Sequence, residues 1–390
     1  MIPVNEALDH LFALVSPLPS ETVPLAEAFG RVLAQDVAAR RDQPPFAASA
    51  MDGYAVAGAD VAPGATFDVV GEAAAGHAFA GNVGSGQAAR IFTGAPMPAG
   101  TDWVVIQEDV DRVDNTITLC DTLETKSYVR PAGSDFKNGD QIKAPRVLSA
   151  SDVALLAAMN IAQVPMARRP VVAIIATGDE LVQPGETPGP DQIIASNSYG
   201  LAALVEGAGG HARMLPIARD NVPALELAFD LSADADLIVT IGGASVGDHD
   251  LVGQVAEAKG MERSFYKIAM RPGKPLMAGR MGNSVMIGLP GNPVSAMVCG
   301  HIFLLPVIRK MLGQGTAPAP RETAPLAHDI GPNGIREHYT RAHIGPDGVT
   351  IFDRQDSALL TVLADANCLA VRPIGDPARS AGDKIDIIRI

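Results

Sequence analysis

Basic side chains gather in one short segment of an otherwise acidic chain, whose formal net charge is −14. The segment KIAMRPGKP places Lys267, Arg271 and Lys274 within eight residues and contains no acidic residue. Its two prolines stiffen the backbone that carries these cations. Lys and Arg donate strong hydrogen bonds to phosphate and other oxyanions, so the segment predicts an anion-binding loop. An ordinary solvent-exposed charged loop is the alternative.

Three glycine-rich segments could complete such a site. They are TGDE at 177–180, GGASVGDHD at 242–250 and GLPGNP at 288–293. Glycine allows backbone N–H groups to approach an anion, and the carboxylates of the first two segments could hold a cation. Asn-Pro is typical of a helix start, whose free N–H groups attract oxyanions. Each segment alone is equally well explained as a tight turn.

The elements that would position these segments alternate between strands and helices from residue 170 to about 316. Apolar runs predict strands at 171–176, 213–217 and 236–241, and amphipathic patterns predict helices at 197–207, 223–231 and 251–259. A hairpin-like insertion at 275–278 and 284–287 precedes a helix that begins at 292–293. This alternation is typical of a three-layer α/β domain with a parallel sheet. All three glycine segments then lie at the carboxyl edge of that sheet, where such domains bind ligands.

Flanking regions predict a multidomain α/β plus β protein. Residues 4–16, 25–33 and 149–162 have helical patterns, the last opened by Ser149 or Ser151. Short β-rich runs between turns occur at 67–70, 88–91, 104–108 and 116–119, and strands with a hairpin turn follow residue 326. The predicted domains are a helical linker domain (1–43 and 145–169), an inserted β domain (44–144), the α/β domain (170–316) and, after a Pro/Ala-rich linker, a C-terminal β domain (326–390).

Composition excludes several classes of protein. The acidic balance argues against nucleic acid as a partner. Three distant cysteines predict neither a disulfide framework nor a zinc site and favour a reducing compartment. The N-terminus lacks a signal-peptide pattern, and the strongest apolar stretch, at 301–308, is too short to span a membrane. We therefore expect a cytoplasmic protein without a membrane partner.

Seven ordered motifs resemble those of one family, the molybdopterin molybdenumtransferases, which comprise MoeA-type proteins and the E domain of gephyrin. The motifs are PPFAASAMDGYAV (44–56), IFTGAPMPAGTDWVVIQED (91–109), ATGDEL (176–181), SNSYGL (196–201), GGASVGDHD (242–250), KIAMRPGKPL (267–276) and GLPGNPVSA (288–296). The resemblance implies an L-shaped, four-domain subunit in a homodimer with a shared active site. It also implies that adenylylated molybdopterin is bound, that its phosphoanhydride is cleaved with Mg²⁺, that AMP leaves, and that molybdate joins the dithiolene.

The resemblance extends to individual positions. Asp52 and Thr93 match residues that reach the cleft from the second subunit, and Glu180, Asp220 and Asp250 match catalytic acids that also bind the metal. Lys274 and Ser295 look like oxyanion ligands, and Arg341, in YTRAHI, matches an arginine near molybdate. The full set of expected substrate-binding residues is Arg130, Asp135, Gly178, Asn197, Gly242, Gly243, Ser245, Lys267, Arg271, Lys274, Pro290, Gly291, Asn292, Pro293, Ser295 and Arg341.

Two other functions remain as alternatives. Single-domain relatives adenylylate molybdopterin, but they lack the 44–145 region and their glycine loop typically reads GGTG, where this chain has GGASVG. A non-catalytic dimeric scaffold, like the gephyrin E domain, is the second alternative. The chain also departs from its relatives: Arg271 stands where Lys is common, and Ser357 and Thr361 stand where relatives tend to place serines.

Overall fold

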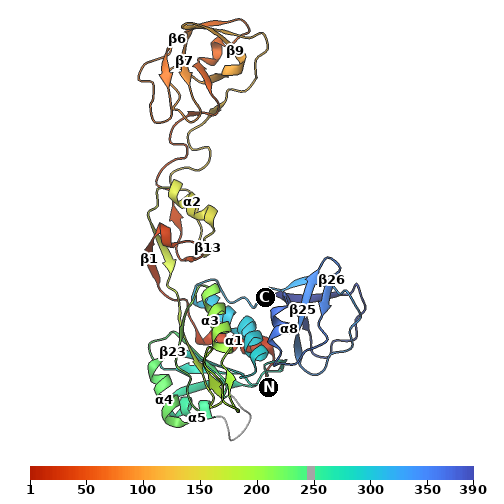
Figure 1. Ribbon diagram of the computed structural model, residues 1–390. Helices are drawn as coiled ribbons and strands as arrows, with labels where there is room; N and C mark the ends of the chain where they lie inside the picture. Colours follow the sequence, from red (N-terminus) through yellow and green to blue (C-terminus); the bar gives the residue numbers. More distant parts are fainter. Residues whose placement is uncertain (244–250) are drawn as a thin grey trace. The chain divides into compact units, whose positions relative to one another are not determined.

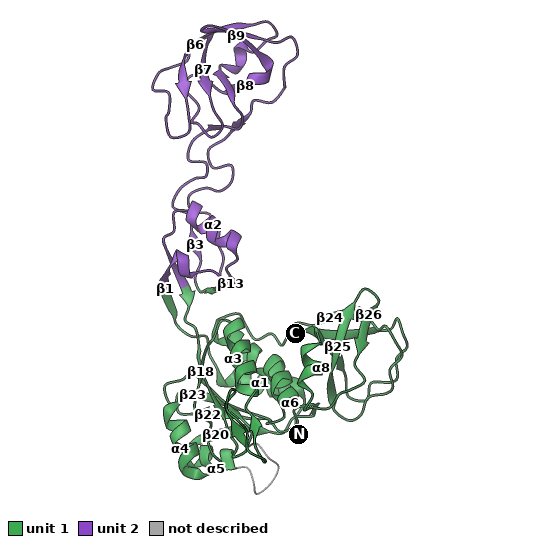
Figure 2. Ribbon diagram, in the orientation of Figure 1, with its two compact units in different colours: residues 1–21, 30–34, 166–390 green, residues 22–29, 35–165 purple. Residues whose placement is uncertain are grey.

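The computed structural model describes residues 1–243 and 251–390, which form two compact units (Figure 2). Unit 1 comprises Met1–Glu21, Gly30–Ala34 and Met166–Ile390, and unit 2 comprises Thr22–Phe29 and Gln35–Pro165. Unit 1 contains the predicted α/β and C-terminal β domains, and unit 2 contains the inserted β domain.

A six-stranded sheet forms the centre of unit 1. Its strands, in spatial order, are β18 (His211–Met214), β15 (Val171–Ala176), β19 (Leu237–Ile241), β23 (Ser284–Leu289), β22 (Met277–Met281) and β20 (Met261–Tyr266). The first four are parallel to one another, and β22 is antiparallel to both of its neighbours. The strands predicted at 171–176 and 236–241 are confirmed, whereas the strand expected at 213–217 lies at 211–214 and β20 was not predicted. The hairpin expected as an insertion is instead part of the main sheet, because β23 is buried along its whole length and pairs with β19.

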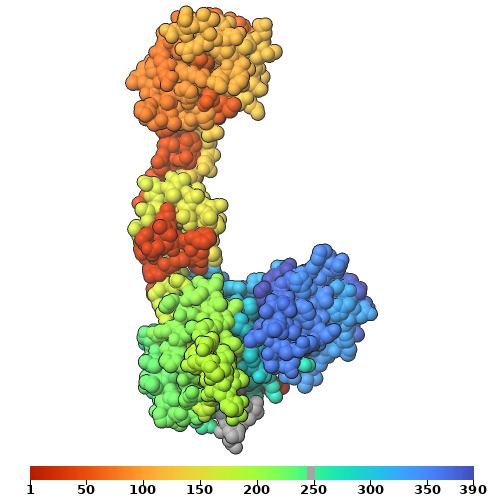
Figure 3. Space-filling model, in the orientation of Figure 1, coloured from red at the N-terminus to blue at the C-terminus, as the bar shows by residue number. Residues whose placement is uncertain are grey.

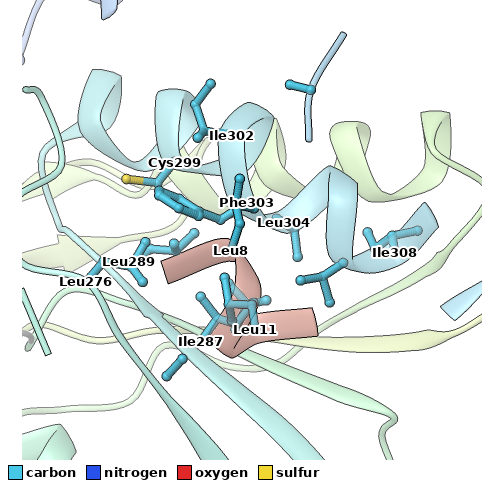
Figure 4. Packing of buried hydrophobic residues seen from close by; sticks show 14 of the residues in the cluster. Leu8, Leu11, Leu276, Ile287, Leu289, Cys299, Ile302, Phe303, Leu304 and Ile308 are labelled. Carbon is cyan, nitrogen blue, oxygen red and sulfur yellow. The ribbon is translucent and has the colours of Figure 1, made fainter. Parts of the chain in front are cut away.

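Helices cover both faces of this sheet and give the predicted three layers (Figure 1). On one face lie α1 (Val4–Leu14), α3 (Asn197–Gly207), α6 (Pro293–Cys299) and α7 (Leu305–Met311). On the other lie α4 (Val222–Leu231) and α5 (Leu251–Ala258). Figure 4 shows Leu8 and Leu11 of α1 packed between the sheet and the helix that contains Phe303.

The position of α1 differs from the predicted grouping with residues 145–169. Its apolar face is buried in the α/β core of unit 1, so this helix is part of the α/β layer structure. The helix expected over 25–33 is also wrong: a 3₁₀ turn, Leu25–Glu27, is followed by the short strand β2 (Val32–Leu33). The third predicted helix is confirmed as α2 (Ala150–Ala158), and Ser149 and Asp152 form a reciprocal capping box at its start.

The inserted domain of unit 2 is a six-stranded sheet. Its spatial order is β8 (Trp103–Ile106), β5 (Gly53–Val56), β7 (Gln87–Ile91), β6 (Thr66–Ala73), β10 (Thr116–Leu119) and β9 (Val110–Val113). The predicted β runs are confirmed, but β5 occupies residues whose pattern is typical of a turn. It is a central strand in which a Cβ on Gly53 would lie 2.0 Å from the Val105 carbonyl oxygen. Glycine at this position thus permits the close approach of β8.

The C-terminal domain is a second sheet of unit 1 and forms the blue surface in Figure 3. Its strands are β21 (Met270–Arg271), β25 (Glu337–Gly345), β26 (Gly348–Ile351), β27 (Cys368–Arg372), β28 (Lys384–Arg389) and β24 (Glu322–Pro325). The predicted hairpin is confirmed by the antiparallel pairing of β25 and β26. The end of the expected linker forms an edge strand, β24, and the short helix α8 (Leu360–Ala364) was not predicted.

The apolar stretch at 301–308, expected to be too short to span a membrane, is part of a longer helical stretch, Pro293–Met311, that is long and apolar enough to cross one by length and composition. This longer stretch runs through α6, a π-helical turn called η4 (Gly300–Leu304) and α7. It is 72% buried inside unit 1, so its apolar character is that of a core helix.

Candidate active site

The three glycine-rich segments meet, where described, in one cavity of about 640 Å³ in unit 1. Each segment follows a strand of the parallel sheet, so the shared edge brings them together as predicted. Expected site residues on the cavity wall are Glu180, Asn197, Asp220, Gly242, Gly243, Pro290, Gly291, Asn292 and Pro293. Ser245 and Asp250 lie outside the described residues.

Tight backbone contacts shape the base of the cavity. Gly242 has φ +92°, and a Cβ there would lie 2.9 Å from the Thr177 carbonyl oxygen. The Gly242 N–H donates to the Leu289 carbonyl at 3.1 Å, which joins the ends of two strands. Across the cavity, the Asn197 side chain donates to the Gly291 carbonyl at 2.7 Å. Asn197 therefore positions the third glycine segment against α3.

Replacing Gly242 by alanine should lower the melting temperature by about 3 °C or more, because strain at positive φ adds to a collision with backbone. Thermal unfolding followed by circular dichroism would measure the change. Gly282→Ala is the matched control, since Gly282 has φ +60° and a Cβ added there would have no atom within 4 Å. Equal losses for both variants would contradict the importance of the Thr177 contact.

Acidic side chains cluster on one wall of the cavity. Partial burial raises the pKa of the Asp220 carboxyl, and the charges of Asp179 and Glu180 raise it further. The Asp220 backbone N–H donates to the Asp179 carboxylate at 3.2 Å, which keeps the acids near one another. Within the described part of the chain, no group of three or more His, Cys, Asp or Glu side chains has metal-ligand geometry. Among the described residues, Glu180 and Asp220 are the predicted metal ligands that reach this cavity.

The basic segment lies beside the cavity and contributes Pro275 to its wall. Neither Lys267, Arg271 nor Lys274 is among the lining residues, and none forms an ion pair with a described residue. Lys267 has φ +71°, and its ammonium lies 4.8 Å from the centroid of the Tyr266 ring. The Ile268 N–H donates to the Lys274 carbonyl at 3.0 Å and closes the segment into a loop.

Two distant parts of the chain hold this loop, and no sequence pattern indicates either of them. The Ile2 N–H donates to the Lys267 carbonyl at 3.2 Å, and the Ile2 carbonyl accepts from Ala269 at 2.8 Å. On the other side, β21 pairs in parallel with β25, and the Glu337 N–H donates to Ala269 at 3.0 Å. The loop is thus fixed between the N-terminal residues and the C-terminal sheet.

Ile2→Pro should loosen the loop, because proline lacks the N–H that bonds to Lys267. We expect the Ala269 amide to exchange with solvent about tenfold faster, as one backbone hydrogen bond and its alignment are lost. Hydrogen–deuterium exchange with peptide or NMR resolution measures this. Ile2→Ala keeps the N–H and should exchange like the parent chain; the same acceleration in both variants would show that the side chain matters instead.

The loop before α8 covers the start of α6. Ser357 accepts from the Val294 N–H through its carbonyl at 3.0 Å, and its hydroxyl accepts from the Asn292 side chain at 3.1 Å. The predicted helix start is confirmed, because Asn292 is the N-cap residue of α6 and Pro293 is its first residue; the Asn292 side chain bonds to Ser357 and not to the helix backbone. Ser295 is buried in α6 and does not line the cavity.

Arg341 lies deep in the C-terminal domain, with only 2% of its surface exposed. Its guanidinium donates to the Asp356 carbonyl at 2.7 Å, to the Gln355 side chain at 3.1 Å and to the Arg354 carbonyl at 3.4 Å. Arg341 is not among the residues that line the cavity, so its expected position near molybdate stays a prediction. Arg341 fixes the loop that carries Ser357 to α6. Gln355, which bonds to both the backbone and the side chain of Arg341, was not predicted.

In unit 2, Asp52 and Thr93 are in direct contact. The Thr93 N–H and hydroxyl both donate to the Asp52 carboxylate at 2.8 Å, and these bonds lower the pKa of Asp52. Arg90, which was not predicted, adds positive charge and lies over the rings of Tyr54 and Phe92. The expected residues Arg130 and Asp135 are exposed in the same unit, on segments that bond to residues 48 and 43.

Comparison with known proteins accounts for the whole chain. Three family models match it in order: the MoeA N-terminal region (domain I and II) at residues 2–160, the probable molybdopterin binding domain at 173–310, and the MoeA C-terminal region (domain IV) at 323–390. A molybdopterin molybdenumtransferase from Nostoc sp. is 37% identical over 410 residues, which cover 100% of this chain and 94% of that one. The chain belongs to the molybdopterin molybdenumtransferase family.

Other relatives agree with this assignment. The Haemophilus influenzae molybdopterin molybdenumtransferase is 37% identical over 80% of this chain and 78% of its own length. The crystal structure of the molybdopterin biosynthesis MoeA protein from Pyrococcus horikosii superposes with a TM-score of 0.86 at 29% identity, covering 100% of this chain and 99% of that one. The predicted family, fold class and transferase activity in molybdenum cofactor biosynthesis are confirmed. The matched N- and C-terminal regions also disfavour the single-domain adenylyltransferase alternative.

In this transferase, the clustered acids Asp179, Glu180 and Asp220 should lower the stability of the fold. The pKa of Asp220 is raised in the folded protein. At pH values above the usual carboxyl pKa, its negative charge therefore lowers the free energy of unfolding. Asp220→Asn should therefore raise the melting temperature by about 1–2 °C at neutral pH, and the gain should shrink near pH ~3.

Asp234→Asn is the control of opposite sign. The Arg213 guanidinium lowers the pKa of Asp234, so its charge stabilises the fold above the usual carboxyl pKa and is lost at low pH. This variant should melt earlier than the parent chain at neutral pH. A melting temperature of Asp220→Asn below that of the parent would contradict the repulsion inferred among Asp220, Asp179 and Glu180.

Proposed function

We propose that this transferase binds adenylylated molybdopterin in the cavity of unit 1, cleaves its phosphoanhydride with the help of Mg²⁺, releases AMP and joins molybdate to the dithiolene. The observation that supports this most is the composition of the cavity wall. Glu180 and Asp220 share that wall with glycine-rich backbone and the start of a long helix, so one cavity offers groups for a cation and for an anion.

The described carboxylates fit a magnesium ion bound together with substrate. Mg²⁺ commonly takes one or two carboxylates and completes its shell with water and phosphate oxygens. Glu180 and Asp220 would hold it, with Asp250 as the third expected ligand, and the raised pKa of Asp220 is consistent with an acidic pair that lacks a described counter-charge. When bound, the ion would supply positive charge to the anhydride oxygens.

The protein's own groups would then orient the reactants. Gly242, Gly243 and Gly291 leave backbone close to the phosphates, while Asn197 fixes the Gly291 segment. Lys267, Arg271 and Lys274 would bind molybdate on the adjoining loop, since no described acid neutralises them. Two anions that repel one another in water would be held together, which lowers the entropic barrier to their reaction. No protein nucleophile is needed.

The active enzyme is proposed to be a cytoplasmic homodimer without nucleic-acid or membrane partners. Asp52 and Thr93 of one subunit would face the cavity of the other. Their two short hydrogen bonds keep Asp52 ionised, so it could accept a hydrogen bond from substrate. The acidic net charge of the chain supports the absence of nucleic acid.

A reconstituted reaction tests the proposal. The purified protein is incubated with adenylylated molybdopterin, Mg²⁺ and molybdate, and both AMP release and active cofactor are measured. We expect both products to form in equal amounts and to vanish when Mg²⁺ is chelated. Failure to release AMP or form cofactor at any molybdate concentration would reject the reaction and leave the dimeric scaffold alternative.

A further inference from the structure

A second cavity of about 400 Å³ adjoins the candidate active site. It lies between α3, the helix that runs through α6 and η4, and α8, all within unit 1. Ser196 and Asn197 line both cavities, so the two are neighbours across the start of α3. Most of its remaining wall is apolar and includes Met297, Leu363 and Ala364.

Two features give this cavity a specific chemistry. A Cβ on Gly200 would lie 2.7 Å from the Met297 sulfur, so glycine lets the thioether lie against the α3 backbone. His301 enters the wall from the π-helical turn η4, a local widening of helices that often marks functional sites. Burial lowers the pKa of His301 to about 4, and its imidazole is therefore neutral at physiological pH.

These walls suit a flat, uncharged ring that contains nitrogen. Sulfur and imidazole contact aromatic rings favourably, and an apolar wall disfavours a charged group. A neutral imidazole offers one N–H donor and one nitrogen acceptor, which match the edge of a nitrogen heterocycle. The volume lies within the range of small-ligand sites.

We infer that the second cavity binds a fused nitrogen heterocycle of the substrate while the attached phosphate occupies the first cavity. This inference rests on the proposed function, whose substrate carries a phosphoanhydride between two such ring systems, adenine and pterin. The shared lining of Ser196 and Asn197 places the ring-binding and phosphate-binding walls side by side, so one ligand can contact both.

Filling the cavity from its exposed side tests the inference. Ala364 is exposed on α8, so Ala364→Phe adds volume without disturbing a buried side chain. Val362→Phe is the control, because Val362 lies on the same helix and does not line the cavity. Calorimetry on the full-length protein with Mg²⁺ would compare AMP, a free pterin, and ribose 5-phosphate, which has the phosphate and sugar but no base.

Ala364→Phe should weaken the binding of AMP or of the pterin about tenfold or more, and the ligand affected identifies the ring. Ribose 5-phosphate should bind equally to all variants, and Val362→Phe should bind like the parent. Unchanged affinity for both ring ligands, or an equal loss for ribose 5-phosphate, overturns the inference. Leu360→Trp, a second substitution on the cavity wall, gives the same comparison if Ala364→Phe does not fold.

The molybdate-insertion assay on the parent chain separates the two proposals. Selective loss of ring binding in an enzyme that inserts no molybdate would retain the ring site and reject the proposed reaction. Insertion of molybdate by the parent chain, together with unchanged ring binding in Ala364→Phe, would support the proposed reaction and reject the ring site.

Discussion

Arg341→Met should lower the free energy of unfolding by about 3 kcal/mol, one of the largest effects expected of a single substitution here. Methionine has a similar length and can fill part of the space, but it donates no hydrogen bond. The Arg354 carbonyl would lose its side-chain partner, while the Asp356 carbonyl would keep only the Leu359 N–H and the Gln355 side-chain oxygen only the backbone N–H of residue 341. Groups left without a partner in the protein interior incur most of their desolvation cost.

Chemical denaturation with a probe in the C-terminal domain measures this loss. The matched control is Arg389→Met on β28, where the arginine forms an ion pair with Glu322 and half of its side chain is exposed. Exposed pairs of this kind contribute little, so the control should unfold like the parent chain. A loss in Arg341→Met no larger than in the control would refute the structural role.

The same substitution should also change the start of α6. Arg341 holds residues 354–356, and the next residue, Ser357, bonds to Asn292 and Val294. Release of this loop should expose the Val294 amide, which hydrogen exchange can detect independently of activity. Arg341 would then act on the active site by positioning Ser357.

Much of the α/β domain could be predicted because its signals are local. The run at 171–176 is apolar at every position, as expected of β15, which is buried on both faces. The helix α1 was also predicted, but the surface against which it packs, the core of the α/β domain, was not. An amphipathic pattern shows that one face must be buried and does not show which surface buries it. β5 was missed because its role depends on Gly53 meeting Val105, which lies on a strand far along the chain.

In the candidate site, too, features with local sequence signals were predicted and features that depend on distant partners were not. The glycine segments were placed together correctly, because strand ends of a parallel sheet share one edge. The helix start at Asn292 was predicted, but the partner of its side chain was not, because Ser357 lies 65 residues away. Likewise, the alternation of side chains along β25 does not show that the Arg341 side chain is buried in the domain. No local sequence pattern links Ile2 with the basic loop. Long-range hydrogen bonds of this kind are fixed by tertiary packing.

Lys274→Ala should raise the molybdate concentration for half-maximal activity by about tenfold to a hundredfold, given the proposed function. One charge-assisted hydrogen bond contributes about 1.5–3 kcal/mol, which corresponds to this range. The backbone of the loop should persist, because the Lys274 carbonyl accepts from Ile268 and Leu276 whatever the side chain is. The maximal rate at saturating molybdate should therefore change much less than the molybdate requirement.

The assay is AMP release and cofactor formation as a function of molybdate at fixed, saturating Mg²⁺. Lys259→Ala controls for net charge, since Lys259 forms an ion pair with Asp230 away from the basic loop. Lys274→Arg keeps the charge but alters the donor geometry, so its molybdate requirement should fall between those of the parent and the alanine variant. An unchanged requirement in Lys274→Ala would rule out molybdate binding by this side chain. An equal rise in Lys259→Ala would instead assign the effect to the general field of the protein, which added salt would screen.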